Sequence, residues 1–135
     1  MSIRRQMLKT ASRAEMSLGD RTEAVVEFIV SRINEDGGFK NRAGRSDLYY
    51  TVFGIESLLA LGVEVPQDKI INYLAQFEHG QSLDFIHLAC LVRCWADIAC
   101  PAEPDICNKI AQRIENYLVE HTTIYTCFLA LCAYQ

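Results

Sequence analysis

The sequence has few prolines and few charged residues, and it lacks the long apolar run of a membrane-spanning chain. Only three of its 135 residues are proline, and 22% are charged. A composition of this kind, with 50% hydrophobic residues, is typical of a folded domain rather than a disordered chain. No apolar run reaches the ~18–20 residues of a membrane span, because Glu56, Arg93 and Asp97 interrupt the longest ones. We therefore predict a single folded domain with no membrane span.

Basic residues are also scarce over most of the chain. There are 13 Lys and Arg against 17 Asp and Glu, for a net charge of −4, and four of the basic residues lie within residues 1–16. Without a broad basic face, a nucleic-acid partner is excluded. We interpret residues 1–19 as a basic N-terminal arm, either a short helix or a frayed segment, and residues 20–135 as the folded domain. A transit peptide is the alternative for the arm.

The chain lacks both a secretory signal and a disulfide framework. Its N-terminus has no apolar stretch of the kind that signals export. The six cysteines form no C-x-x-C pair, and four of them (Cys90, Cys94, Cys127 and Cys132) lie in apolar runs, where cysteine behaves as a small hydrophobic residue. We therefore expect reduced thiols and a cytoplasmic location.

Helical periodicity is the main positive signal in the sequence. Three stretches have one apolar side and one polar side, and three others are apolar nearly all round. The first group is 21–35, 68–77 and 106–120, and the second is 48–61, 83–99 and 124–134. A helix that is apolar all round is expected to be buried on every side. The two kinds alternate along the chain, which predicts an all-α fold of about six helices.

The alternation is a repeat of helix pairs. Phe28, Tyr73 and Tyr117 recur at spacings of 45 and 44 in the half-exposed stretches, and Tyr50, His87 and Tyr125 recur at 37 and 38 in the apolar ones. Such periods indicate stacked helical hairpins. Residues suited to capping helix N-termini stand before the predicted helices, namely Ser46 or Asp47, Asp68, Asp105, and Thr122 or Thr123.

One segment carries a family resemblance. Residues 36–51 read Asp-Gly-Gly-Phe-Lys-Asn-Arg-Ala-Gly-Arg-Ser-Asp-Leu-Tyr-Tyr-Thr, and an apolar stretch follows as far as Gly62. This resembles the repeat of protein prenyltransferase β subunits and, more loosely, terpene-cyclase repeats, in which a D-G-G-F loop leads into an inner helix. The resemblance implies an α/α toroid, whose inner helices line a central cavity.

The resemblance also implies a ligand. In the family, basic residues of the matching loop hold the diphosphate of an isoprenoid donor, and Arg42 and Arg45 match them best. Tyr49 and Tyr50 at the start of the inner helix belong to the aromatic lining that the resemblance implies. A solvated basic loop is the alternative. If the protein is an enzyme, we expect a prenyltransferase-like transferase.

The zinc site of the family is incomplete in this sequence. It needs an Asp, a Cys two residues later and a distant His. Asp47 stands at the first position, but Tyr49 replaces the Cys, so we expect no bound zinc by this motif. Asp84 and His87, one helical turn apart, remain weak metal candidates together with Asp47; a helix cap beside a hydrogen-bonded histidine is the alternative.

A hydrolase or lyase that uses Asp84 and His87 has no further support in the sequence, and two other functions stay open. The first is a prenyltransferase-like protein that binds an isoprenoid diphosphate in an aromatic inner cavity. The second is a non-catalytic helical-repeat module for protein interaction or self-assembly. A family toroid needs roughly twice as many helices as this chain supplies, so half a toroid would expose an apolar edge. We therefore expect self-association or a partner that supplies the missing half.

Overall fold

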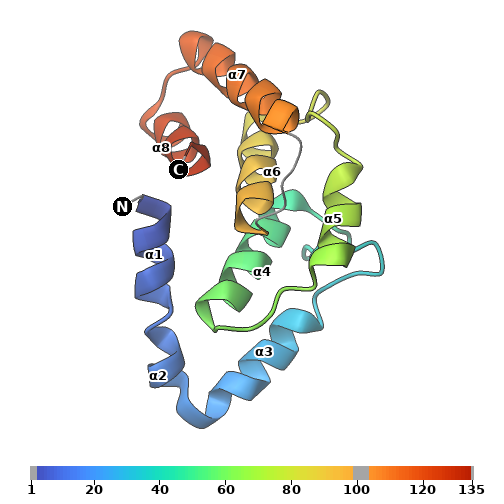
Figure 1. Ribbon diagram of the computed structural model, residues 1–135, viewed down its shortest axis with the longest axis vertical. Helices are drawn as coiled ribbons and strands as arrows, with labels where there is room; N and C mark the ends of the chain where they lie inside the picture. The colour runs from blue at the N-terminus through green and yellow to red at the C-terminus, as the bar shows by residue number, and fades with distance from the viewer. Residues whose placement is uncertain (1–2, 99–103, 135) are drawn as a thin grey trace.

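The computed structural model describes residues 3–98 and 104–134, and this part of the chain is all α-helical (Figure 1). No strand occurs in it, although two isolated antiparallel bridges join Ile33 to Phe39 and Lys40 to Ser46. The helices are α1 (Ile3–Ala11), α2 (Ala14–Leu18), α3 (Thr22–Val30), α4 (Leu48–Ala60), α5 (Gln67–Ala75), α6 (Phe85–Asp97), α7 (Pro104–Glu120) and α8 (Ile124–Ala133), with one 3-10 turn over Gly19–Arg21. The predicted all-α class is confirmed.

The six helices predicted from periodicity correspond to α3 through α8. Asp47 and Thr123 are confirmed as N-caps, since their side chains accept hydrogen bonds from the backbone N–H groups of Tyr49 and Thr126. The predicted cap Asp68 is wrong, because α5 begins one residue earlier, after Pro66. The predicted cap Asp105 is wrong for the same reason, because α7 begins one residue earlier, at Pro104.

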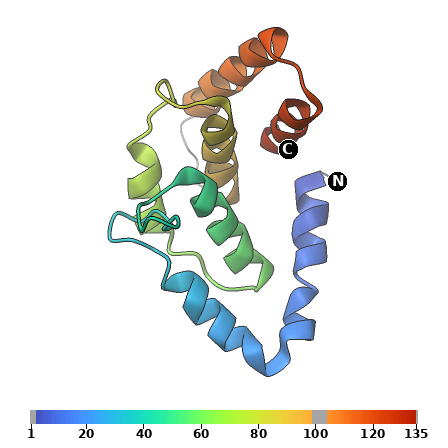
Figure 2. The ribbon, with the colours of Figure 1, turned by 180° about the vertical axis from the view of Figure 1, so that it is seen from behind.

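Helices α4 and α6 form the centre of the fold. Helix α6 packs against both α4 and α8, and its other neighbours are α5 and α7. Figures 1 and 2 show α5 on one side of this central pair and α1 and α8 on the other. The core is built from fully buried aliphatic side chains, each of which stabilises the fold by roughly 1.5–3 kcal/mol. Its largest members include Ile55, Leu58, Leu74, Leu91 and Ile110.

Two of the apolar helices are not buried on every side, so that expectation is wrong for α4 and α8. Helix α4 exposes Tyr49, Tyr50 and Phe53. Helix α8 exposes Ile124 and three further residues, Tyr125, Phe128 and Leu131. Helix α6 comes nearest to the expectation, with eight of its 13 residues buried, although Ile86 is 37% exposed. The reason is that no other helix of the described chain covers these faces of α4 and α8.

The N-terminal arm is helical and is attached to the domain. Helix α1 packs against α4, and the Arg4 guanidinium donates to Oδ1 of Asp97 on α6 at 2.8 Å. The packing order α4, α6, α8 is the one that stacked hairpins produce, while closure into a toroid stays a prediction. None of the helices within the described residues is long and apolar enough to cross a bilayer.

Candidate functional site

The D-G-G-F loop is held in one conformation by its own side chains. The Asp36 carboxylate accepts hydrogen bonds from the Gly38 N–H at 3.0 Å and from the Ser46 hydroxyl at 2.6 Å. Gly37 has φ of +94°, and a Cβ there would lie 1.9 Å from the carbonyl oxygen of Lys69, so only glycine fits. Phe39 is buried, and its ring lies where a Cβ on Gly54 would be.

The loop is tied directly to the start of α4. The Phe39 N–H donates to the hydroxyl oxygen of Thr51 at 3.0 Å, and this hydroxyl donates to the Asp47 carbonyl at 2.7 Å. The Asp47 N–H donates to the Phe39 carbonyl at 3.1 Å. Gly37 and Thr51 of the motif are therefore explained by packing and hydrogen bonding. The loop fixes where the N-terminus of α4 points.

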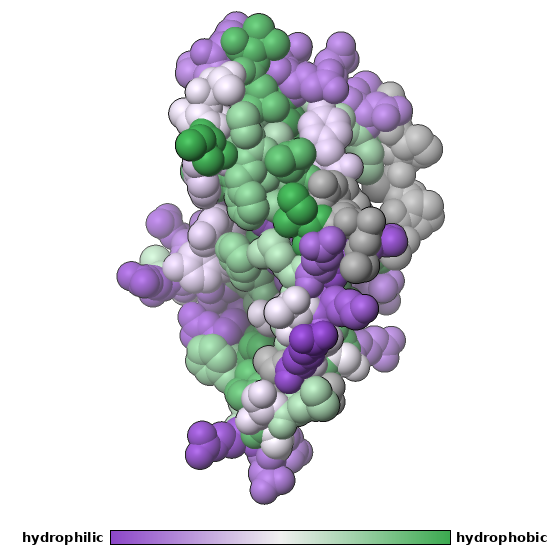
Figure 3. Space-filling model, turned by 90° about the vertical axis from the view of Figure 1, so that its left-hand side faces the viewer, coloured by the Kyte–Doolittle hydropathy of each residue, from purple (hydrophilic) through white to green (hydrophobic). Residues whose placement is uncertain are grey.

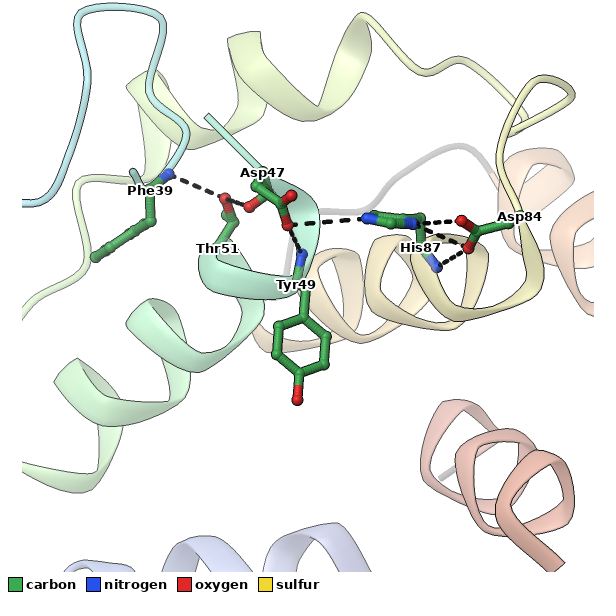
Figure 4. Close-up of polar contacts among 6 residues, drawn as sticks. All are labelled: Phe39, Asp47, Tyr49, Thr51, Asp84 and His87. Carbon is green, nitrogen blue, oxygen red and sulfur yellow. Dashed lines mark hydrogen bonds and ion pairs between the residues drawn. The ribbon is translucent and has the colours of Figure 1, made fainter. Parts of the chain in front are cut away.

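Three of the residues predicted as candidates meet at the N-termini of α4 and α6 (Figure 4). Nδ1 of His87 lies 2.8 Å from Oδ2 of Asp84, the N-cap of α6, and Nε2 lies 3.8 Å from Oδ1 of Asp47, the N-cap of α4. Burial alone would raise the pKa of the Asp84 carboxyl, but the backbone N–H and the ring of His87 lower it below the usual value. The imidazole thus sits between two carboxylates from neighbouring helices.

This arrangement does not fit the family's zinc site. A carboxylate on one ring nitrogen of a histidine is a common feature behind a metal ligand, and Asp84 has that position. Only Asp47 and His87 are then left as side chains that face each other and could bind a metal ion. The third position belongs to Tyr49, whose ring points away from the pair (Figure 4) and contacts Phe53 at 5.0 Å between ring centroids. Within the described residues no group of three His, Cys, Asp or Glu is placed to hold a metal ion.

The two predicted arginines lie in different concavities. Asn41 organises the loop between them, since its side-chain oxygen accepts from the N–H groups of Ala43 and Arg45. Arg42 lines a pocket of about 420 Å³ between α3 and α4. Arg45 lines another concavity, beside Asp36 and Ser46. The structure therefore brings Arg42 together with Tyr50 and leaves Arg45 and Tyr49 outside that pocket.

The Arg42 pocket combines positive charge with aromatic rings. Its cations are Arg32, Lys40 and Arg42, and its walls are Phe28, Ile29, Phe39, Tyr50, Phe53, Gly54 and Ser57. The Arg32 guanidinium lies 6.0 Å from the centroid of the Phe28 ring, and Lys40 Nζ donates to the Ser31 carbonyl at 3.3 Å. We define this site as the basic aromatic pocket. Such a lining suits a ligand with an anionic end and an apolar body.

An apolar cavity of about 400 Å³ adjoins this pocket beneath α1. Ile29, Phe53 and Ser57 line both spaces. We call the second space the inner cavity. Its remaining lining consists of Arg4, Met7, Leu8 and Ala11 of α1, Val25 of α3, Glu56, Ala60 and Leu61 at α4, and Arg93 and Cys132. A ligand that spans both spaces would pass Phe53.

Two partly buried ion pairs border the inner cavity. Arg93 donates to Oε1 of Glu56, and its guanidinium lies 5.6 Å from the centroid of the Phe53 ring. Arg4 and Asp97 form the second pair. Burial of Asp97 and the nearby Glu56 charge raise the pKa of the Asp97 carboxyl to about 6, although Arg4 opposes this. Both pairs place charge beside the cavity with only 2–14% of each side chain exposed.

The chain matches no protein-family model, no curated protein and no solved structure. The resemblance to prenyltransferase repeats therefore rests on the sequence of the D-G-G-F segment and the helix after it.

Several residues of these sites were not predicted as site residues. Glu56, Arg93 and Asp97 were noticed only as interruptions of apolar runs. A charge inside an otherwise apolar helix signals a buried pair, because an unpaired buried charge is strongly destabilising. The sequence does not say which partner each charge takes, since the partners are 37 and 93 residues apart. Phe28 was recognised only as a repeat position, and Arg32 only as part of the polar side of an amphipathic helix.

Proposed function

We propose that the chain binds an isoprenoid diphosphate, as a prenyltransferase-like helical-repeat protein. The diphosphate lies among Arg32, Lys40 and Arg42, and the isoprenoid runs along Phe53 into the inner cavity. The observation that carries the proposal is the sharing of Ile29, Phe53 and Ser57 by a basic pocket and an apolar cavity. Charge at one end and apolar walls at the other match the two parts of this ligand class.

The chemistry at each end supports the same assignment. Guanidinium groups bind phosphate oxygens through charge-assisted hydrogen bonds, worth about 1.5–3 kcal/mol each. The tail gains free energy from burial, at about 0.8 kcal/mol per CH₂ group. A pocket of about 420 Å³ and a cavity of about 400 Å³ fall in the range of small-molecule sites, which is roughly 300–1,000 Å³.

The proposal concerns binding, and prenyl transfer is the reaction if the protein is an enzyme. In that case the three cations would stabilise the departing diphosphate. Prenyl transfer to a thiol also needs an activated acceptor. For that task, Asp47 and His87 offer two possible metal ligands that face each other, which is one fewer than the family's zinc site needs.

Calorimetric titration with farnesyl diphosphate tests the proposal. Arg42→Ala is expected to weaken binding about tenfold or more, because loss of one charge-assisted contact is worth at least about 1.4 kcal/mol. Arg45→Ala is the matched control, since it removes the same charge from the same loop but outside the pocket, and binding should be nearly unchanged. Inorganic diphosphate and farnesol should each bind more weakly than the intact ligand. No heat with the wild-type protein, or equal losses in both variants, contradicts the proposal.

Self-association is the second candidate function. The observation in its favour is the exposed apolar side of α8, where Ile124 is 93% exposed. The basic aromatic pocket and the α8 surface have no residue in common, so both functions can belong to one protein.

A further inference from the structure

Helix α1 forms one wall of the inner cavity. Its residues Arg4, Met7, Leu8 and Ala11 line that space and follow one another at i, i+3, i+4 and i+7, which is one side of a helix. None of the nine residues of α1 is itself buried. In Figure 3, which faces this side of the molecule, apolar residues gather in the upper half, and hydrophilic residues are frequent in the lower half. Helix α1 therefore lies on the cavity, outside the core.

The remaining contacts of α1 attach it only weakly. Lys9, on the side away from the cavity, is exposed, and α4 is the main helix that α1 contacts. An isolated helix of fewer than about 12–15 residues is marginally stable in water, so α1 depends on its contact with the domain to stay ordered. Segments with few buried apolar contacts open at a lower free energy than the core does. Helix α1 therefore has the properties of a segment that opens locally.

The connection between α1 and α3 allows such an opening. Residues 12–13 form a turn after α1, and Gly19 begins the 3-10 turn that precedes α3. Gly19 has φ of +51°, and a Cβ there would meet no atom of the described residues within 4 Å. Helix α2 packs mainly against this 3-10 turn. Helices α1 and α2 can therefore rotate about Gly19 without separating α3 from α4.

The Arg4–Asp97 pair holds α1 against α6. The guanidinium lies 2.8 Å from Oδ1 of Asp97, and the two side chains are only 11% and 2% exposed. The pairing is incomplete, because Nε of Arg4 and Oδ2 of Asp97 are buried and have no hydrogen-bond partner among the described residues. Burial raises the pKa of Asp97 to about 6, although Arg4 opposes this. Opening would let water reach two polar atoms whose burial without a partner is unfavourable.

We propose that α1 is a movable cover of the inner cavity. Loss of the Arg4–Asp97 contact lets α1 move away about Gly19 while α3 through α8 stay folded, and the apolar walls of the cavity become accessible. The closed position keeps those walls from water when the cavity is empty. Entry of an isoprenoid tail by this route rests on the proposed function, whereas the movement of α1 does not.

Thiol labelling with N-ethylmaleimide tests the cover without any ligand. Cys132 lines the inner cavity and is only 3% exposed, and burial raises the pKa of its thiol, so an open form should react much faster than the closed one. Cys94 is fully buried in α6 and should react only when the whole domain unfolds. Mass spectrometry of the labelled peptides should show Cys132 reacting at least about tenfold faster than Cys94 in the wild-type protein, because local opening costs less than global unfolding.

Two variants of α1 separate the cover from other ways of exposing Cys132. Arg4→Ala should speed the labelling of Cys132 about tenfold, the factor that corresponds to loss of one charge-assisted hydrogen bond. Lys9→Ala removes the same charge from the exposed side of α1 and should leave the rate unchanged. Fraying at the end of α8 would also expose Cys132, but its rate would not depend on Arg4.

Ile70→Val separates local opening from global unfolding. It shortens a fully buried side chain of α5, away from the cavity, so it should speed the labelling of Cys94 and leave that of Cys132 unchanged. The proposal is overturned by equal rates for Cys132 and Cys94 in the wild-type protein, by equal effects of Arg4→Ala and Lys9→Ala on Cys132, or by an equal rise at both thiols in Ile70→Val. Farnesyl diphosphate should slow the labelling of Cys132; if it does not bind, the proposed function fails while the ligand-free rates still test the cover.

Discussion

Nε2 of His87 lies 3.8 Å from Oδ1 of Asp47, while Nδ1 of the same ring lies 2.8 Å from Oδ2 of Asp84. One imidazole therefore joins the N-cap residues of α4 and α6, the two helices at the centre of the fold. The three residues predicted as weak metal candidates serve here as a link between helix ends, and this role explains them without a metal.

Asp84→Ala should destabilise the fold by about 1 kcal/mol near pH 7, since an N-cap contributes about 0.5–2 kcal/mol. His87 holds the pKa of the Asp84 carboxyl below its usual value. The stabilisation that comes from ionised Asp84 is therefore present above the pKa of Asp84 in the unfolded state. It is lost as the pH falls through the lower pKa of Asp84 in the folded state. Urea denaturation followed by circular dichroism, at neutral and acidic pH, measures the difference.

Asp68→Ala is the matched control for that measurement. Asp68 is an exposed residue in the first turn of α5, and Pro66 rather than Asp68 holds the N-cap position. The same substitution there should change stability by less than about 0.5 kcal/mol. Equal effects of the two substitutions would show that Asp84 does not act as a cap.

Asp97→Asn should remove a pH dependence of the unfolding free energy whose sign is opposite to that expected from Asp84. The pKa of Asp97 is raised to about 6 in the folded protein, mainly by burial, against an ordinary value near 3.9. The folded state therefore takes up its proton first, and the contribution of Asp97 to stability increases as the pH falls from above 6 to about 4. The increase amounts to at most about 3 kcal/mol, at 1.36 kcal/mol per pKa unit.

The measurement is the difference in unfolding free energy between wild type and Asp97→Asn across that pH window. Wild type should gain stability relative to the variant on acidification. A difference that stays flat, or that moves the other way, would mean that Asp97 is solvated and ionised in the folded protein.

Gly54→Ala should destabilise the protein, although alanine favours helices by about 1 kcal/mol over glycine. A Cβ at position 54 would lie 2.3 Å from the Phe39 ring, and overpacking of this kind costs about 1–3 kcal/mol. The free-energy cost of the clash with Phe39 should exceed the gain in helix propensity. Phe39→Leu makes room, so the double variant should show less loss than the two single losses added together. Additive losses in this double-mutant cycle would rule out contact between the two positions.

The sequence was sufficient to predict the order and type of the six repeat helices. Their apolar spacing is local, and Asp47 and Thr123 carry capping signals that act within a few residues. The sequence was not sufficient to predict the features that depend on packing between helices far apart in the chain. The apolar sequence of α8 matched that of a buried helix, yet Ile124 is 93% exposed, because a periodic pattern cannot say whether a neighbouring helix exists to cover it.

The candidate site was predicted only in part for the same reason. Asp47, Asp84 and His87 were each recognised, but their meeting depends on how α4 and α6 pack. Arg42 and Arg45 are three residues apart in sequence, and the Asn41-centred turn between them sends them to separate concavities. A count of basic residues in a loop cannot distinguish one joint anion site from two separate positions.

The pairing of Arg4 with Asp97 also has a consequence for synthesis on the ribosome. The two residues are 93 positions apart, so at about 5–20 residues per second Asp97 is added on the order of 5 to 20 seconds after Arg4. Helix α1 can reach α4 well before that, but its guanidinium then has no carboxylate from α6. The N-terminal helix therefore reaches its final, charge-compensated position only after two helix pairs have been translated.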